Sequence, residues 1–157
     1  PTRRGKPLTR PQFIAKERGL TFTFAQRTLR DVHPNSVLIQ LEGVWGGRLE
    51  MGASSLGGGR VKVFQVDGLS TSFSGELPTL VVHNSDQPGC VSQVTGALAQ
   101  EGINVATLQL NRGGRGESAV MVIECDQPIP QATADAIRAL PGILRVNRYT
   151  PRTGETI

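Results

Sequence analysis

The chain has 157 residues, enough for one ordinary domain or two small ones. A hydrophobic content of 38% with only 4% aromatic residues predicts an aliphatic core built on Val, Leu, Ile and Ala. The longest apolar runs are too short to cross a bilayer, and no charged-then-apolar leader opens the chain. We therefore expect a cytoplasmic protein with no membrane partner.

The basic residues are concentrated at the N-terminus. Residues 1–30 hold eight Lys or Arg against one acidic residue, a net charge of +7, whereas residues 31–157 hold nine basic and twelve acidic residues, a net charge of −3. A nucleic-acid interface needs basic side chains interleaved with aromatic or base-reading groups, and residues 31–157 lack that pattern. We expect no nucleic-acid partner and keep binding through residues 1–30 as an alternative.

The cysteines and histidines form no recognisable site. Cys90 and Cys125 match no zinc or iron–sulfur spacing, and each falls where an apolar residue is expected, so we predict buried, reduced thiols. His33 and His83 are solitary, with no carboxylate at catalytic or metal-binding spacing. We therefore predict no catalytic residue and no bound metal in this chain.

The first 76 residues divide into a basic segment and a β-rich region. We expect residues 1–13 to be disordered or unassigned and residues 14–76 to form a partial β-rich domain. A helix is predicted to end over 13–18, stopped by Gly19, and a strand to follow over 21–25. Turns at Gly46-Gly47 and Asp67-Gly68 separate the further strands, which are predicted over 36–43, 48–55, 60–66 and 69–75.

Residues 77–150 follow the order β-α-β-β-α-β, with a short tail over 151–157. Pro88 and Pro130 suit the first positions of two helices, and Gly102 suits the end of the first. Two βαβ halves of this size predict an α+β, ferredoxin-like unit whose four-stranded antiparallel sheet carries both helices on one face. Because the other face is expected to be bare, we predict homodimerisation.

Polar residues at the start of the first of these helices are candidates for binding a small amino acid. Free amides there attract a carboxylate, Asp86 can accept from an ammonium group, and Asn84 and Asn104 both donate and accept. The same residues also serve to satisfy the turn and the first helical amides, and their chemistry alone leaves both interpretations open.

Two glycine-rich segments are weaker candidates. The run Ser54-Ser-Leu-Gly-Gly-Gly-Arg60 has successive amides that can form a nest for an anion, or it is a tight turn between strands. It follows neither the Walker nor the Rossmann pattern. Arg112-Gly-Gly-Arg-Gly116 is interpreted as a mobile hairpin turn.

The segment from about Leu80 to Tyr149 resembles an ACT domain, a regulatory module that often binds amino acids at a dimer interface. The matching residues are the turn ending Asp86-Gln-Pro88-Gly89, the Gly102-Ile103-Asn104 signature, and Leu140-Pro141-Gly142 before the final strand. The resemblance places Asn84, Asp86, Gly89 and Asn104 at ligand-contacting positions.

Residues 14–149 together resemble the β chain of bacterial iron–sulfur-dependent L-serine dehydratase. The segments that carry this resemblance are IAKERGLTFTF, His33-Pro34-Asn35-Ser36, Ser55-Leu56-Gly57-Gly58-Gly59, VVHN, Asn111-Arg112, Gly116-Glu117 and MVIECDQPI. It implies an enzyme that converts L-serine to pyruvate and ammonia, with a [4Fe–4S] cluster on a separate catalytic α chain. It also implies that L-serine or another small amino acid binds the ACT domain, and that Ser55, Gly57, Gly58 and Gly59 lie near the α-chain interface.

This chain departs from the family pattern at its N-terminus, where the family's Ser-Ser-His-Thr stretch is missing. The resemblance therefore implies a chain that is inactive alone and acts as a regulatory or structural subunit. The alternatives are a stand-alone amino-acid-binding module and the C-terminal part of an enzyme like phosphoglycerate dehydrogenase, which carries the same two domain types.

Overall fold

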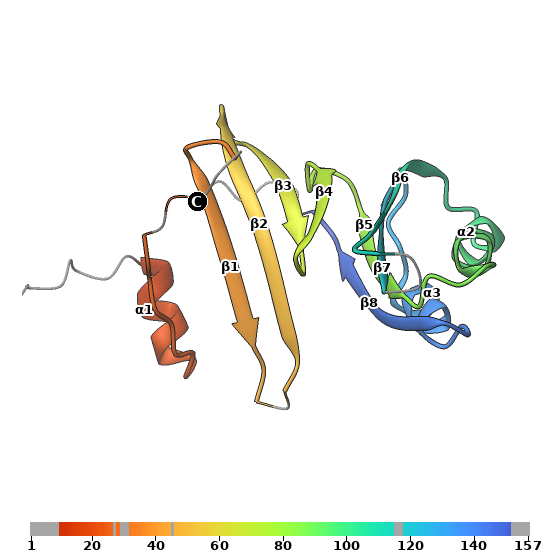
Figure 1. Cartoon of the computed structure of the whole chain (residues 1–157), viewed down its shortest axis with the longest axis horizontal. Coiled ribbons are helices and arrows are strands. Elements are labelled where there is room, and N and C mark those ends of the chain that lie inside the picture. Colours follow the sequence, from red (N-terminus) through yellow and green to blue (C-terminus); the bar gives the residue numbers. More distant parts are fainter. Residues whose placement is uncertain (1–9, 27, 29–31, 45, 115–117, 152–157) are drawn as a thin grey trace, which may run out of the picture. The chain divides into compact units, whose positions relative to one another are not determined.

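The computed structural model of the chain describes residues 10–26, 28, 32–44, 46–114 and 118–151 (Figure 1). Two compact units are present, Pro1–Asp31 and Val32–Ile157. The larger unit contains both β-sheets of the chain, so the predicted boundary between residues 76 and 77 stays a prediction.

The smaller unit contains the helix α1 (Arg10–Glu17). Gly19 has a φ of 75° and its N–H donates to the Lys16 carbonyl oxygen at 3.0 Å, which ends the helix as predicted. Because the helix begins at Arg10, the expectation of disorder is wrong for residues 10–13. Residues 1–9 lie outside the described part of the chain. The predicted strand over 21–25 is wrong: this stretch pairs with no described strand, and alternation of side chains does not supply the partner that a strand's backbone requires.

The first sheet of the larger unit is an antiparallel meander in the order β1-β2-β3-β4. Its turn between β3 and β4 has positive φ at both central residues, 47° at Asp67 and 81° at Gly68, which is the conformation that hairpin turns favour. The four strands match the predicted ones: β1 (Ser36–Glu42), β2 (Arg48–Gly57), β3 (Arg60–Val66) and β4 (Leu69–Phe73).

The second sheet is antiparallel in the order β6-β7-β5-β8, and the predicted α+β fold class with a βαββαβ second part is confirmed. Its elements are β5 (Thr79–Asn84), α2 (Cys90–Gln100), β6 (Val105–Arg112), β7 (Ala119–Cys125), α3 (Gln131–Arg138) and β8 (Ile143–Tyr149). No helix in the described residues is both long enough and apolar enough to cross a membrane.

Both helices pack on one face of this second sheet (Figure 1). We call the resulting cluster the helix-side core. It is aliphatic, as the composition predicts, and its fully buried members include Leu80, Val82, Met121 and Ile123 from the strands and Val94, Leu98 and Ile137 from the helices.

The opposite face of the second sheet is covered by the first sheet. Val81, Val120 and Val122 of the second sheet pack with Val63, Val66 and Phe73 of the first, and we call these six residues the inter-sheet core. The expectation of a bare face is therefore wrong, because β3 and β4 of the same chain occupy it. Homodimerisation therefore stays a prediction.

The start of α2 also differs from the prediction. The helix begins at Cys90, and Gly89 is its N-cap with a φ of 93°, so Pro88 lies in the turn and not at the first helical position. The Gly89 carbonyl accepts the first helical hydrogen bond, from the Gln93 N–H at 2.9 Å. A left-handed N-cap suits glycine, which has no Cβ to oppose it.

Candidate functional site

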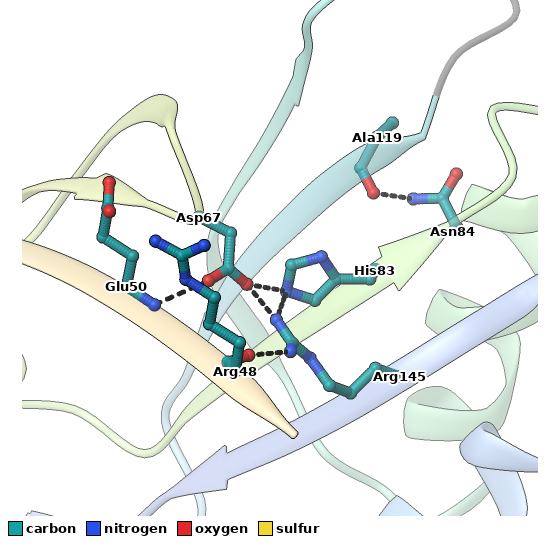
Figure 2. A network of polar contacts seen from close by, with 7 residues as sticks. All are labelled: Arg48, Glu50, Asp67, His83, Asn84, Ala119 and Arg145. Carbon is teal, nitrogen blue, oxygen red and sulfur yellow. Dashed lines mark hydrogen bonds and ion pairs between the residues drawn. The ribbon is translucent and has the colours of Figure 1, made fainter. Parts of the chain in front are cut away.

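The turn between β5 and α2 is the predicted amino-acid site, and Asn84 lies at its beginning. Asn84 is 2% exposed. Its amide nitrogen donates to the Ala119 carbonyl oxygen at 3.2 Å (Figure 2). Its amide oxygen accepts the Asp86 N–H at 3.0 Å. Asn84 therefore shapes the turn through its own side chain, as an Asx turn does.

Asp86 takes a φ of 52° and orients its carboxylate toward the end of β6. There, Arg112 Nη1 donates to Asp86 Oδ2 at 3.2 Å, so a guanidinium already occupies one of the positions expected for a ligand ammonium group. The Arg112 side chain is half exposed, whereas the Asp86 side chain is only 11% exposed, so solvent reaches this pair mainly from the Arg112 side. Residues 115 and 116 of the predicted hairpin turn lie outside the described part of the chain.

Gly142, in the turn between α3 and β8, supports the other side of this site. Its carbonyl accepts the Ser85 N–H at 2.9 Å. A Cβ at Gly142 would lie 2.9 Å from Ser85 Oγ and 3.0 Å from Cys90 Sγ, and its φ is 76°. Both the close approach and the backbone conformation require glycine here.

Asn104 lies at the opposite end of the second sheet from Asn84. Along β7, Asn84 pairs with Ala119 while Val105, the residue after Asn104, pairs with Cys125. Six residues of strand separate these positions, about 20 Å. The exposed Asn104 amide donates to Asp126 Oδ2 at 2.6 Å. Within one chain, the structure therefore brings Asn84, Asp86 and Gly89 together and leaves Asn104 apart.

The glycine motif forms the hairpin between β2 and β3. Gly57, Gly58 and Gly59 all have positive φ, and Gly57 pairs with Arg60 across the turn, which is the tight-turn geometry. At the base of this hairpin, the Ser55 N–H donates to the Asn35 carbonyl oxygen at 2.8 Å and the hydroxyls of Ser36 and Ser54 lie 2.8 Å apart. The His33–Ser36 and Ser54–Gly59 motifs, distant in sequence, are thus adjacent in the fold.

A polar cluster that the sequence did not predict connects the two sheets. Figure 2 shows Asp67, from the β3–β4 turn, pointing toward His83 on β5 and Arg145 on β8. His83 Nε2 is 3.0 Å from Asp67 Oδ2 and 2.6 Å from Arg145 Nη2, and Arg145 also pairs directly with Asp67. We call these three residues the Asp67 cluster.

The Asp67 cluster also holds the beginning of β2. The Glu50 N–H donates to Asp67 Oδ1 at 2.7 Å, and Arg145 Nη1 donates to the Arg48 carbonyl oxygen at 2.7 Å (Figure 2). A cavity of about 350 Å³ lies against the cluster, and its apolar lining includes Leu69, Val120 and Leu144. The cluster therefore lies at the wall of a cavity that has both polar and apolar lining residues.

Burial lowers the pKa of His83 below its ordinary value of 6.5, and the Arg145 guanidinium lowers this pKa further. The Asp67 carboxylate opposes both effects. A lowered pKa favours the neutral imidazole at neutral pH. The interpretation of His83 as solitary is therefore wrong, since the β3–β4 hairpin brings a carboxylate from sixteen residues away; the Asp67-Gly68 turn signal was the one available clue.

The cysteines behave as predicted. Cys90 and Cys125 are both free and buried, on α2 and β7. Burial, followed by the charge of Asp126, raises the pKa of Cys125 to about 11, which disfavours the reactive thiolate. Among the described residues, no three His, Cys, Asp or Glu side chains come together to hold a metal ion.

Comparison with known proteins shows which family the second sheet and its helices resemble. Residues 79–142 match the family model of the ACT domain. A probable L-serine dehydratase β chain of Bacillus subtilis is 32% identical over 86% of this chain and 61% of that protein. An L-serine dehydratase β chain of Peptoniphilus asaccharolyticus is 30% identical over 87% of this chain and 60% of that protein.

A third relative shares only part of the chain. D-3-phosphoglycerate dehydrogenase of Methanocaldococcus jannaschii is 31% identical over 52% of this chain and 16% of that enzyme. The chain spans about 60% of the length of the two serine dehydratase β chains. The resemblance to the β chains of L-serine dehydratase is confirmed, and residues 79–142 of this chain form an ACT domain.

Proposed function

We propose that this chain is the regulatory β subunit of an L-serine dehydratase and that its ACT domain binds L-serine or another small amino acid. The observation that carries the proposal is identity of 30–32% to two such β chains across more than four fifths of this chain. The phosphoglycerate dehydrogenase of M. jannaschii is 31% identical over only 52% of this chain, and two others that match more than 80% of it are 21–25% identical, which favours the dehydratase assignment.

The iron–sulfur cluster of the proposed enzyme belongs on the α chain. A [4Fe–4S] cluster takes four thiolates, whereas this chain has two cysteines, and both are buried in the ACT part. The residues of this chain therefore do not fit the cluster. The contribution of this chain to the proposed enzyme is regulatory or structural. The Ser55–Gly59 hairpin, next to the exposed His33–Ser36 segment, is the surface that we assign to the α-chain contact.

The amino-acid site requires two copies of the chain. Asn84 and Asp86 lie at one end of the second sheet and Asn104 at the other, about 20 Å away, so a single small ligand cannot touch both ends in one copy. In a twofold dimer whose two sheets lie antiparallel and side by side, the Asn84 end of one copy meets the Asn104 end of its partner, and two shared sites result.

Calorimetry with L-serine and other amino acids tests the binding. We expect heat of binding for the wild type and a loss of at least about tenfold in affinity for Asn104→Ala, because a polar ligand group loses its partner. Gln100→Ala, which removes an exposed amide at the end of α2, is the matched control and should bind normally. No heat with any amino acid would exclude the sensor role.

The shared site has its own test. Asp86→Ala and Asn104→Ala chains, each deficient alone, should regain binding when they are unfolded together and refolded, because a mixed dimer contains one intact site. Unchanged deficiency in mixtures shown to contain mixed dimers would contradict a shared site.

The subunit assignment is tested by capture of a cysteine-rich α chain and by assay of the complex for conversion of L-serine to pyruvate. A second candidate function is a module from an enzyme resembling phosphoglycerate dehydrogenase, which the partial match to the M. jannaschii protein supports. This candidate would be favoured if the chain captured no cysteine-rich partner while it still bound serine.

A further inference from the structure

The proposed ligand turn and the Asp67 cluster share the same two strands. On β5, His83 and Asn84 are consecutive, so their side chains point to opposite faces of the sheet: Asn84 into the ligand turn and His83 toward the first sheet. On β8, the strand begins just after Gly142, which accepts the Ser85 N–H at 2.9 Å, and Arg145 follows three residues later. Each strand thus joins the ligand turn to the cluster over a very short distance.

The pairing between these strands is irregular at this point. His83 pairs with Arg145 and Asn84 pairs with Ile143, which leaves Leu144 as an extra residue on β8. A bulge of this kind bends its strand and re-orients the neighbouring side chains. The direction of the Arg145 side chain therefore depends on how the Gly142 end of β8 is held by the ligand turn.

The first sheet depends on the cluster in turn. Asp67 Oδ1 accepts the Glu50 N–H at 2.7 Å, and the Asp67 N–H donates to the Glu50 carbonyl oxygen at 2.8 Å. Arg145 adds a bond to the Arg48 carbonyl oxygen. One carboxylate and one guanidinium therefore join the beginning of β2 and the β3–β4 turn to the ACT sheet.

We propose that the Asp67 cluster transmits occupancy of the ligand turn, Ser85–Gly89, to the first sheet. The inference rests on the proposed amino-acid binding and names its route of regulation. A ligand that orders the turn also fixes Gly142 through Ser85, which holds Arg145 against Asp67. By linkage, the cluster then favours ligand binding by the same factor as the ligand favours the cluster.

Residue-resolved hydrogen exchange of the full chain, with and without saturating L-serine, is the test. In the wild type, serine should slow exchange of the Glu50 and Asp67 amides by about fivefold or more, the lower end of typical coupling. In Asp67→Asn, serine should still bind, about fivefold more weakly, and this slowing should disappear. Arg145→Gln should behave alike and provides a second variant should Asp67→Asn fold poorly.

Gln109→Ala is the matched control. Gln109 on β6 accepts the Ser72 N–H at 3.0 Å, so it also joins the two sheets but lies outside the Asp67 cluster. Slowing at Glu50 and Asp67 should persist in this variant. Protection of core amides such as those of Val82 and Met121 reports whether each variant is folded.

The outcomes separate the two proposals. No serine binding by the wild type would overturn both. Serine binding without slower exchange at Glu50 and Asp67, or with slowing that survives in Asp67→Asn and Arg145→Gln, would overturn the route and leave the amino-acid sensor standing. The route is supported if the slower exchange at Glu50 and Asp67 is lost in both cluster variants and kept in Gln109→Ala.

Discussion

Strands β1 and β7 are both seven residues long and mainly aliphatic, yet they have opposite environments. Every residue of β7 is buried, whereas six of the seven residues of β1 are exposed. β7 lies inside its sheet, with the helix-side core on one face and the inter-sheet core on the other. β1 is the edge of the first sheet and contributes to neither core.

The burial of β7 and the exposure of β1 show that the two sheets are stabilised in different ways. The second sheet has a core that its own helices complete. The buried apolar residues of the first sheet are Val63, Val66 and Phe73 of β3 and β4, which pack on the second sheet, and β2 adds the partly buried Leu49, Met51 and Ala53. The first sheet therefore depends on the second for its core.

Phe73→Ala should cost about 3–5 kcal/mol of the free energy of unfolding, because it removes the largest side chain of the inter-sheet core. Denaturant unfolding followed by circular dichroism measures the loss. Phe24→Ala, at a position 75% exposed, is the matched control and should cost no more than about 1 kcal/mol. Equal losses in the two variants would contradict the dependence of the first sheet on the second.

Ile123→Ala and Val37→Ala compare the two strands directly. Ile123 on β7 is fully buried in the helix-side core, and its truncation should cost about 2–5 kcal/mol. Val37 on β1 is 51% exposed, and its truncation should change stability by about 0.5 kcal/mol or less. The same denaturation experiment applies; a large effect at Val37 would indicate that β1 is covered in solution.

Gly142→Ala should destabilise the chain by about 2 kcal/mol, from a strained φ and a clash with Ser85 and Cys90. Gly102→Ala has a similarly positive φ but open space around the added Cβ, so it should cost only about 1 kcal/mol. Thermal unfolding of both variants separates the strain from the clash, and identical values would argue against close packing of the ligand turn on Gly142.

Acidification should weaken the folded state through His83. Its pKa is lowered on folding, so the unfolded chain takes up a proton first. The contribution of His83 is complete above its ordinary pKa of 6.5 and is lost as pH falls through its lowered folded-state pKa. Melting temperatures between pH 8 and pH 5 should fall less steeply for His83→Gln, and parallel profiles would contradict this role.

Thiol reagents should leave the native chain almost unmodified at pH 8. Cys90 and Cys125 are both buried in the helix-side core, and the pKa of Cys125 is raised to about 11. Both thiols should react after unfolding in denaturant, which serves as the control. Rapid labelling of the native chain would show that the core of the second sheet opens more readily than its burial indicates.

Local patterns predicted most of the secondary structure because they depend on neighbouring residues. The Asp67-Gly68 dipeptide specifies its hairpin turn, and Gly102 ends α2 with a φ of 67°. Local patterns gave a wrong prediction where an element requires a neighbouring strand, as for the strand expected over 21–25. They also placed the start of α2 at Pro88, because the pattern does not show that Gly89 adopts the left-handed conformation.

The candidate site was predicted only in part for the same reason. Asn84 and Asp86 are two residues apart, so their proximity follows from the turn. The distance between Asn84 and Asn104 depends on the direction of β6 within the sheet, which no short motif encodes. The Asp67 cluster draws on three segments that meet only because β3 and β4 lie on the second sheet.

The ACT domain, the order of the strands along the chain and the aliphatic core could be predicted from the sequence, because periodicity, turn residues and motif spacing are properties of contiguous segments. Only the tertiary structure decided which face of the second sheet is covered, that His83 has charged partners, and that Asn104 is remote from Asn84. These features result from packing between segments far apart in the chain, where the burial of apolar surface, and not local preference, selects the arrangement.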